Sequence, residues 1–212
     1  EKGGLIVMKQ YGFLIDMQNC YGCKTCSMAC KSENMTPMGV LWRRVRERHT
    51  DEPNTQAFIS MSCNHCDSPI CFEKCPQSAI IKAADTGLMS IDEEKCIGCG
   101  TCAIVCPYNA PKVDEEKKKA VRCNGCAERV AAGEKPVCVE ACPARALDFG
   151  PGGDMEKLGE RAAIAPFPRP AATVPNLFVK PSADARPAES KDGVVANLLE
   201  VGFRATDKEI ME

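Results

Sequence analysis

The chain has 212 residues, 26% of them charged, and a formal net charge of −2. This length allows one or two small domains, and the charge gives no basic excess for nucleic-acid binding. Aromatic residues make up only 5%, which argues against a large apolar core. We find no run of eighteen apolar residues, no signal-peptide pattern and no twin-arginine pair near the N-terminus, so we expect neither a membrane span nor an export signal.

Two predicted strands lead into the first two cysteine motifs. Tyr11–Asp16 (YGFLID) precedes the motif Cys20-x2-Cys23-x2-Cys26-x3-Cys30. Phe58–Ser62 precedes the motif Cys63-x2-Cys66-x4-Cys71-x3-Cys75, which a proline follows. Between these motifs, Leu41–Arg48 (LWRRVRER) is a basic segment with the only tryptophan. We expect it to be a solvated strand or helix face, and the alternatives are a contact surface for an acidic partner or a group that raises a neighbouring redox potential.

A predicted hairpin connects the second motif to the third. Ser78–Lys82 and Leu88–Asp92 flank a turn that contains Gly87. The third motif is Cys96-x2-Cys99-x2-Cys102-x3-Cys106, and the fourth is Cys123-x2-Cys126-x11-Cys138-x3-Cys142; a proline follows each. Inside the long gap of the fourth motif we predict a short helix that ends at Gly133.

The four motifs use all sixteen cysteines of the chain. A C-x2-C-x2-C run places three thiolates on one tight loop, and the fourth cysteine begins a helical turn where proline is tolerated. Sixteen ligands at four per cubane predict four [4Fe–4S] clusters. Disulfides do not explain repeated C-x2-C pairs with proline behind the last cysteine. Zinc is the stronger alternative for the fourth motif alone, but the three ferredoxin-type runs beside it favour iron.

The motif order predicts an α+β fold with two nested ferredoxin-like modules. We place an outer module at residues 8–56 and 115–150, an inserted module at 57–114 and a C-terminal arm at 151–212. In two-cluster ferredoxins the last cysteine of each run binds the neighbouring cluster. This rule assigns four ligand sets: Cys20, Cys23, Cys26 and Cys142 (cluster 1); Cys123, Cys126, Cys138 and Cys30 (cluster 2); Cys63, Cys66, Cys71 and Cys106 (cluster 3); Cys96, Cys99, Cys102 and Cys75 (cluster 4). Since the cysteines complete every set, His65 is at most a hydrogen-bonding neighbour of a cluster.

Six prolines interrupt the segment Ala165–Pro187, so we expect neither a regular helix nor a central strand there. Apolar residues alternate with the prolines, which favours an extended arm on a partner over a flexible tail. The chain offers no acid–base pair or nucleophile, because every cysteine is assigned to iron. We therefore expect a non-catalytic electron-transfer protein, and a free soluble polyferredoxin or a zinc-bound structural module is the alternative.

The chain resembles the iron–sulfur subunit of anaerobic dimethyl sulfoxide reductases, which are molybdopterin oxidoreductases. The likeness rests on YGFLIDMQNCYGCKTCSMACK, SCNHCDSPICFEKCP, CIGCGTCAIVCPYNAP and RCNGCAERVAAGEKPVCVEACPARALDFG, and on the proline-rich segment APFPRPAATVPNLFVKPSADARP. The cysteine motifs alone are also similar to electron-transfer subunits of nitrate, polysulfide, thiosulfate and tetrathionate reductases and of formate dehydrogenases. Some relatives have tryptophan at the place of Cys102 and a three-iron cluster, so cysteine there implies four cubanes.

The resemblance implies a subunit that relays electrons between two partners. A large molybdopterin catalytic subunit would face cluster 1, and a membrane anchor that oxidises quinol would face cluster 4. It also implies a complex at the bacterial cytoplasmic membrane, on the periplasmic face if it is exported with the catalytic subunit, with the cytoplasmic face as the alternative. The substrate and the direction of electron flow stay open, because this subunit would not touch the substrate.

Overall fold

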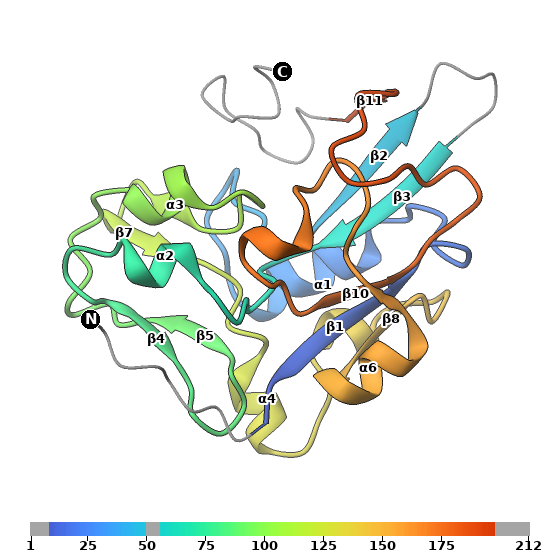
Figure 1. Ribbon diagram of the computed structural model, residues 1–212. Coiled ribbons are helices and arrows are strands. Elements are labelled where there is room, and N and C mark those ends of the chain that lie inside the picture. The colour runs from blue at the N-terminus through green and yellow to red at the C-terminus, as the bar shows by residue number, and fades with distance from the viewer. Residues whose placement is uncertain (1–8, 50–55, 198–212) are drawn as a thin grey trace.

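The computed structural model describes residues 9–49 and 56–197, which form short helices and four small sheets (Figure 1). The helices are α1 (Thr25–Glu33), α2 (Ile70–Glu73), α3 (Thr101–Val105), α4 (Ala127–Ala131), α5 (Val137–Glu140), α6 (Gly152–Leu158) and the 3-10 helix η1 (Pro170–Ala172). The strands are β1 (Tyr11–Asp16), β2 (Arg44–His49), β3 (Gln56–Met61), β4 (Ile80–Lys82), β5 (Met89–Ile91), β6 (Lys112–Asp114), β7 (Lys119–Val121), β8 (Leu147–Pro151), β9 (Glu160–Arg161), β10 (Leu177–Lys180) and β11 (Val194–Val195). This mixture of helices and small sheets agrees with the expected α+β class.

The largest sheet has the strand order β8-β1-β10-β9. Strand β1 pairs antiparallel with β8, with Phe13 opposite Phe149, and their rings lie 4.8 Å apart. Because β1 leads into the first cysteine motif and β8 follows the fourth, this pairing brings the two motifs together. Helices α1 and α5, which carry cysteines of these motifs, pack against each other.

Two hairpins carry the middle of the chain. Strands β4 and β5 pair antiparallel, and Gly87 in their turn has a φ of +67°, so the predicted hairpin is confirmed. Strands β6 and β7 pair from Lys112 opposite Val121 to Asp114 opposite Lys119. The predicted boundary after residue 114 falls inside this second hairpin. We call residues 57–121, which extend to the end of this hairpin, the inner unit.

The apolar core is larger than the aromatic content suggested. Phe13, Ile15 and Phe149 from the large sheet pack with Ile59 and Met61 of β3, and all five are buried. The second core cluster, mainly within the inner unit, is different. Half of its buried members are cysteines: Cys63, Cys71, Cys96, Cys102 and Cys123. Apolar packing therefore supports the outer part of the molecule, and the inner unit depends on what its cysteines bind.

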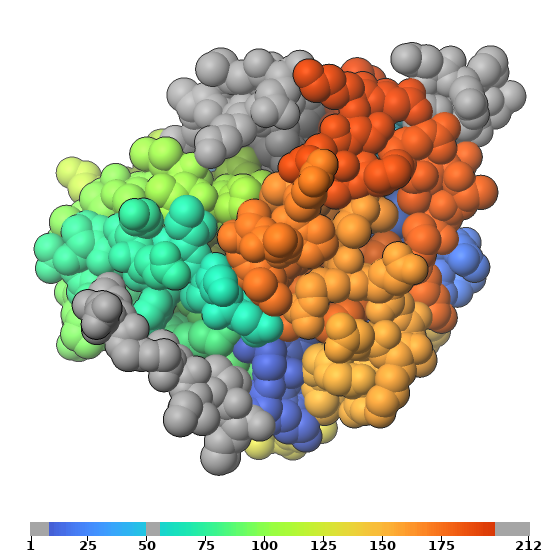
Figure 2. All heavy atoms as spheres, viewed as in Figure 1, coloured from blue at the N-terminus to red at the C-terminus, as the bar shows by residue number. Residues whose placement is uncertain are grey.

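The segment after Gly150 folds back onto the chain, which corrects the prediction of an extended arm for residues 151–197. Strand β10 lies between β1 and β9 and pairs parallel to β1, with Phe13 opposite Leu177. Phe167 and Phe178 are almost completely buried. The prolines permit this strand because Pro175 and Pro181 lie outside Leu177–Lys180. Figure 2 shows the segment over a large part of this face, directly beside the inner unit. The remainder of the predicted arm, residues 198–212, lies outside the described residues.

A search of residues 9–49 and 56–197 for a membrane-spanning helix finds none with the required length and apolar character.

Candidate metal centres

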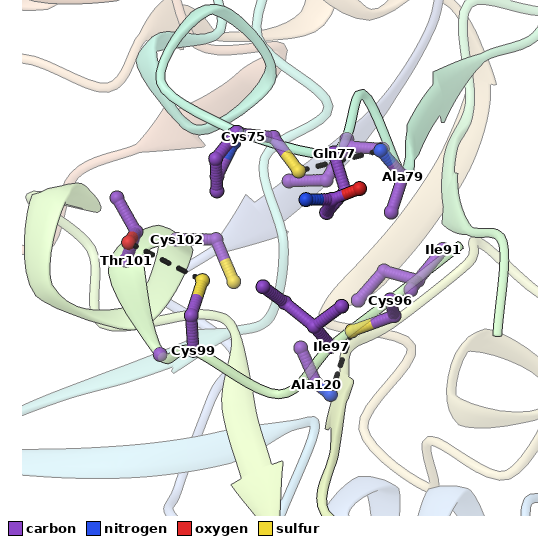
Figure 3. A pocket seen from close by; sticks show the side chains of 13 residues that line it. Cys75, Gln77, Ala79, Ile91, Cys96, Ile97, Cys99, Thr101, Cys102 and Ala120 are labelled. Carbon is purple, nitrogen blue, oxygen red and sulfur yellow. Dashed lines mark hydrogen bonds between the residues drawn. The ribbon is translucent and has the colours of Figure 1, made fainter. Parts of the chain in front are cut away.

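Four cysteines from two motifs surround each of two hollows. The first hollow is lined by group 1, which comprises Cys20, Cys23, Cys26 and Cys142. The second is lined by group 4, which comprises Cys75, Cys96, Cys99 and Cys102. In Figure 3 the sulfur atoms of group 4 lie around one space between the loop of the third motif and the end of the second. In both groups three cysteines share a loop, and the fourth comes from the other motif.

The electrostatic neighbours of two buried cysteines bring together two further sets. Burial and the charges of Cys123, Cys138 and Cys126 raise the pKa of the Cys30 thiol, and these four form group 2. Burial and the charges of Cys63, Cys106 and Cys71 raise the pKa of Cys66 to about 12, and these four form group 3.

The loop at the start of each motif turns through a left-handed residue. Gly22, His65, Gly98 and Gly125 each lie two places after the first cysteine and have φ between +44° and +75°. This turn directs a backbone N–H at the preceding sulfur, with N–Sγ distances of 3.3 Å from His65 to Cys63 and 3.4 Å from Gly125 to Cys123. Such hydrogen bonds to sulfur favour the thiolate that iron requires.

The last cysteine of a motif receives a similar hydrogen bond. The N–H of Ala79 donates to Cys75 and that of Ala146 donates to Cys142, each over 3.3 Å. In both places the chain turns through a left-handed residue just after the proline, at Ser78 and Arg145. The first motif has Lys31 instead of proline, and α1 accordingly continues past Cys30 to Glu33.

Groups 1 and 4 each bring one thiol to the surface. Cys23 and Cys99 are the only exposed cysteines among the sixteen, all of which the structure describes. A threonine hydroxyl lies 3.4 Å from each of these sulfurs, Thr25 beside Cys23 and Thr101 beside Cys99. These hydrogen bonds lower the pKa of both thiols. The two end groups are therefore built alike, with an accessible sulfur held by a hydroxyl.

Electrostatic interactions connect the groups in pairs. The charge of Cys26 in group 1 acts on Cys138 in group 2. The charge of Cys63 in group 3 contributes to the pKa of Cys123 in group 2. The charge of Cys71 in group 3 likewise contributes to the pKa of Cys102 in group 4. Charges thus link group 1 to group 2, group 2 to group 3 and group 3 to group 4, and the exposed sulfurs belong to groups 1 and 4.

The arginines of Leu41–Arg48 are buried, so the prediction of a solvated face is wrong. Arg43, Arg44 and Arg46 have at most 1% of their surface exposed. Strand β2, which begins at Arg44, lies between β3 and β11 and is covered by the folded-back C-terminal segment. Arg43 donates to the hydroxyls of Ser60 and Ser62. The thiolate charges that raise its pKa, against burial, are those of Cys138, Cys26, Cys123 and Cys30.

Two further buried residues lie beside the sulfurs of group 3. Arg122 donates from Nη2 to Cys63 and from Nη1 to Cys71, the latter over 3.5 Å. Although burial raises the pKa of Cys63, the charges of Arg122 and His65 lower it to about 5. The Nδ1 atom of His65 accepts the N–H of Met89 over 2.9 Å, which leaves Nε2 as its proton donor. The sequence drew attention to His65 but gave no sign of Arg122.

The donor chemistry fits iron–sulfur clusters. Groups 1 and 4 each line a hollow with four thiols, and burial with mutual repulsion raises the pKa of several cysteines, including Cys102 to about 11. Such thiols become thiolates only if cations lie between them, and metal binding supplies those cations. Four sulfurs around a hollow, with N–H groups aimed at them, are the surroundings that a [4Fe–4S] cluster needs.

Comparison with known proteins agrees with this donor set. A family described as 4Fe-4S dicluster domain matches residues 54–151. The B subunit of the anaerobic dimethyl sulfoxide reductase of Escherichia coli strain K12 is 46% identical over 204 residues, which cover 91% of this chain and 98% of that protein. The protein belongs to the family of dimethyl sulfoxide reductase B subunits. It is an iron–sulfur, electron-transfer subunit and not a catalytic one, and its sixteen cysteines fit four [4Fe–4S] clusters.

Two other relatives show how far the likeness extends. The B subunit of the Haemophilus influenzae enzyme is 44% identical over 206 residues, or 92% of this chain and all of that protein. The B subunit of the polysulfide reductase of Wolinella succinogenes is 36% identical over 183 residues, or 82% of this chain and 95% of that protein. The likeness therefore covers the C-terminal segment as well as the cysteine motifs.

The C-terminal segment of this subunit also reaches group 3. The hydroxyls of Thr173 and Tyr108 lie 2.9 Å apart, and a hydrogen bond from Thr173 lowers the pKa of Cys66, against burial and Cys63, which raise it. Asn176 donates from its side chain to the carbonyl oxygen of His65 over 2.9 Å and to Asp67 over 2.8 Å. These contacts hold the loop of the second cysteine motif. No signal in the proline-rich sequence pointed to them.

Replacing Thr173 with valine is expected to loosen this contact. The variant keeps the shape but loses the hydroxyl, and one such hydrogen bond contributes about 1 kcal/mol. For a chain of this size that corresponds to a fall in melting temperature of about 2–4 °C, measurable by anaerobic calorimetry. Tyr108→Phe is the matched control, since it removes the hydroxyl partner but leaves Thr173 beside Cys66. We expect both variants to melt earlier and only Thr173→Val to lower a cluster potential; an unchanged potential in Thr173→Val would exclude the sulfur contact.

Proposed function

We propose that this subunit relays electrons within a dimethyl sulfoxide reductase-type complex, between a quinol-oxidising membrane anchor and a molybdopterin catalytic subunit. The observation that carries the proposal is the set of four linked thiol groups, with exposed sulfurs in groups 1 and 4. A [4Fe–4S] cluster in each group would supply one-electron transfer. The protein around them would hold the sulfurs in place and keep water from groups 2 and 3.

The ligand sets proposed for the four clusters are groups 1 to 4. Their support is the shared hollows of groups 1 and 4 and the electrostatic neighbours within groups 2 and 3. We also propose that the fold consists of two nested two-cluster modules. Groups 1 and 2 would form the outer module and groups 3 and 4 the inner one, with its end moved to Val121. The pairing of β1 with β8 supports this nesting.

Groups 1 and 4 are the proposed docking places for the two partners. Beside Cys23 the side chains of Tyr21 and Met28 are 58% and 59% exposed. Beside Cys99 the side chains of Ile97 and Ile104 are 59% and 70% exposed. Large apolar side chains next to an accessible sulfur suit a protein contact that shortens the distance for electron transfer. We assign the group 1 end to the catalytic subunit and the group 4 end to the anchor, and we place the complex at the bacterial cytoplasmic membrane, on its periplasmic face.

Anaerobic purification of the tagged subunit from its native membrane tests the relay. Iron, zinc and molybdenum are measured in the eluate together with the co-purifying proteins. About sixteen iron atoms on this chain, with molybdenum and a large partner, are expected. Iron without molybdenum or a partner would indicate a free polyferredoxin, and zinc in place of iron would contradict the proposal.

Paired serine variants test the ligand sets. If Cys142 belongs with the first motif, Cys142→Ser and Cys23→Ser are expected to change the same component of the electron paramagnetic resonance spectrum of the complex. Cys30→Ser is expected to change a different component, shared with Cys126→Ser. A partition by motif makes the opposite prediction, because Cys23 and Cys30 would then serve one cluster. Each variant should lose or convert one cluster and keep the other three.

A further inference from the structure

Two buried guanidinium groups lie beside the thiols of neighbouring groups. Arg43 is 1% exposed and Arg122 is 5% exposed. Within residues 9–49 and 56–197, the ion pairs found include neither of these arginines. An unpaired buried charge costs several kcal/mol, so each guanidinium needs an anion in its surroundings.

The surroundings of Arg122 supply sulfur as that anion. Its two Nη atoms donate to Cys63 and Cys71, both in group 3. Burial raises the pKa of Cys102 in group 4, and the charge of Arg122 lowers it. Arg122 therefore lies at the junction between groups 3 and 4, with its direct contacts on the group 3 side.

Arg43 occupies the corresponding place between groups 1 and 2. It donates from Nη1 to the hydroxyl of Ser60 and from Nη2 to the hydroxyl of Ser62, each over 3.1 Å. The Ser60 hydroxyl lies 3.3 Å from the sulfur of Cys26 in group 1. The other thiols whose charges act on Arg43 are all in group 2: Cys138, Cys123 and Cys30. The ring of Phe13 covers the guanidinium at 4.5 Å and keeps its surroundings apolar.

We propose that Arg43 and Arg122 are positioning residues for electron transfer, whose fixed charges raise the reduction potentials of the clusters on both sides of the junctions 1/2 and 3/4. This inference rests on the proposed ligand sets. Reduction adds one negative charge beside the guanidinium, and arginine keeps its proton throughout the physiological pH range. The charge is therefore permanent, and it stabilises the reduced form more than the oxidised form. In a buried site such an effect is weakly screened by solvent.

The test uses the purified complex, with reduction potentials measured by titration under electron paramagnetic resonance. Arg122→Gln removes the charge and keeps a donor, and Arg122→Lys keeps the charge. Arg43→Gln and Arg43→Lys form the second pair. Arg169→Gln is the control, because Arg169 is exposed and pairs with Glu189 over 2.7 Å. The wild-type complex is measured first, since about sixteen iron atoms and four spectral components establish the proposed function independently of the arginines.

We expect Arg122→Gln to lower the equilibrium constant for reduction of cluster 3 at least tenfold, which is about 59 mV for one electron. Cluster 4 should shift less and cluster 1 should stay unchanged. Arg43→Gln should shift clusters 1 and 2 and spare cluster 4, and the lysine variants should shift much less than the glutamine variants. The proposal would be overturned if the glutamine variants kept full iron and unchanged reduction potentials, or if the potentials of all four clusters shifted equally. It would also be overturned if the lysine variants shifted the potentials as much as the glutamine variants do.

Failure to assemble also gives an answer. If both glutamine variants lose iron and both lysine variants keep it, the charge is required at the junctions, which supports the proposal. If the lysine variants lose iron too, the shape of arginine and not its charge is what the site needs, and the proposal fails.

Discussion

Truncation after Gly150 is expected to prevent the protein from folding, and not merely to detach it from a partner. The deleted part contains β10, which fills the centre of the large sheet between β1 and β9. Phe167, Leu177, Phe178 and Val179 would be lost from the core, where each is at most 2% exposed. Burial of one such side chain contributes about 1.5–3 kcal/mol, so their sum is on the scale of the whole net stability of a domain, about 5–15 kcal/mol.

Point variants separate this effect from the loss of a docking surface. Phe178→Ala leaves the backbone in place and is expected to cost about 3–5 kcal/mol, seen as a lower midpoint in anaerobic thermal unfolding. Leu158→Ala is the matched control, since Leu158 is 45% exposed and should change stability little. A truncated protein that binds full iron and unfolds at the same temperature as the complete one would refute the role assigned to β10.

The sequence identified strands and turns whose determinants are local. YGFLID became β1 with the predicted bounds and is buried from Gly12 to Asp16, and the turn at Gly87 needed only a residue that tolerates positive φ. Strand β10 was missed because its partner β1 lies more than 160 residues away and the prolines around it suggested irregular structure. Proline removes a backbone N–H donor from the sheet only at its own position. A four-residue strand between Pro175 and Pro181 is therefore compatible with a central place in the sheet.

In the metal centres, too, the sequence showed local determinants but not contacts between distant segments. Spacing and the cross-ligation rule supplied the ligand sets proposed for the four groups, because those constraints depend only on the positions of the cysteines in the sequence. The residues that face the sulfurs from other elements were not visible. Arg122 precedes a cysteine but contacts the sulfurs of Cys63 and Cys71, about 50 residues or more away in the sequence. Arg43 looked like part of a solvated basic face, since periodicity does not show that a later segment covers β2.

Removal of iron is expected to unfold the inner unit while part of the large sheet survives. In the inner unit, β4 pairs only with β5 and β6 only with β7, three residues each, and isolated two-stranded hairpins are at best marginally stable. The buried cluster around them is half cysteine, and without iron those thiols take up protons. Arg122 would then lose the thiolates of Cys63 and Cys71 and remain as a buried charge without an anion, which costs several kcal/mol.

The large sheet has different support. Strands β1, β8 and β10 bury Phe13, Phe149 and Phe178 and do not include a cysteine. Hydrogen exchange on the anaerobic protein before and after chelation separates the two regions. The amides of β4 to β7 should lose their protection completely, those of β1 and β10 should keep a measurable part of it, and reconstitution with iron and sulfide should restore both. Protected amides in β4 to β7 of the iron-free protein would show that the hairpins are stable without the metal.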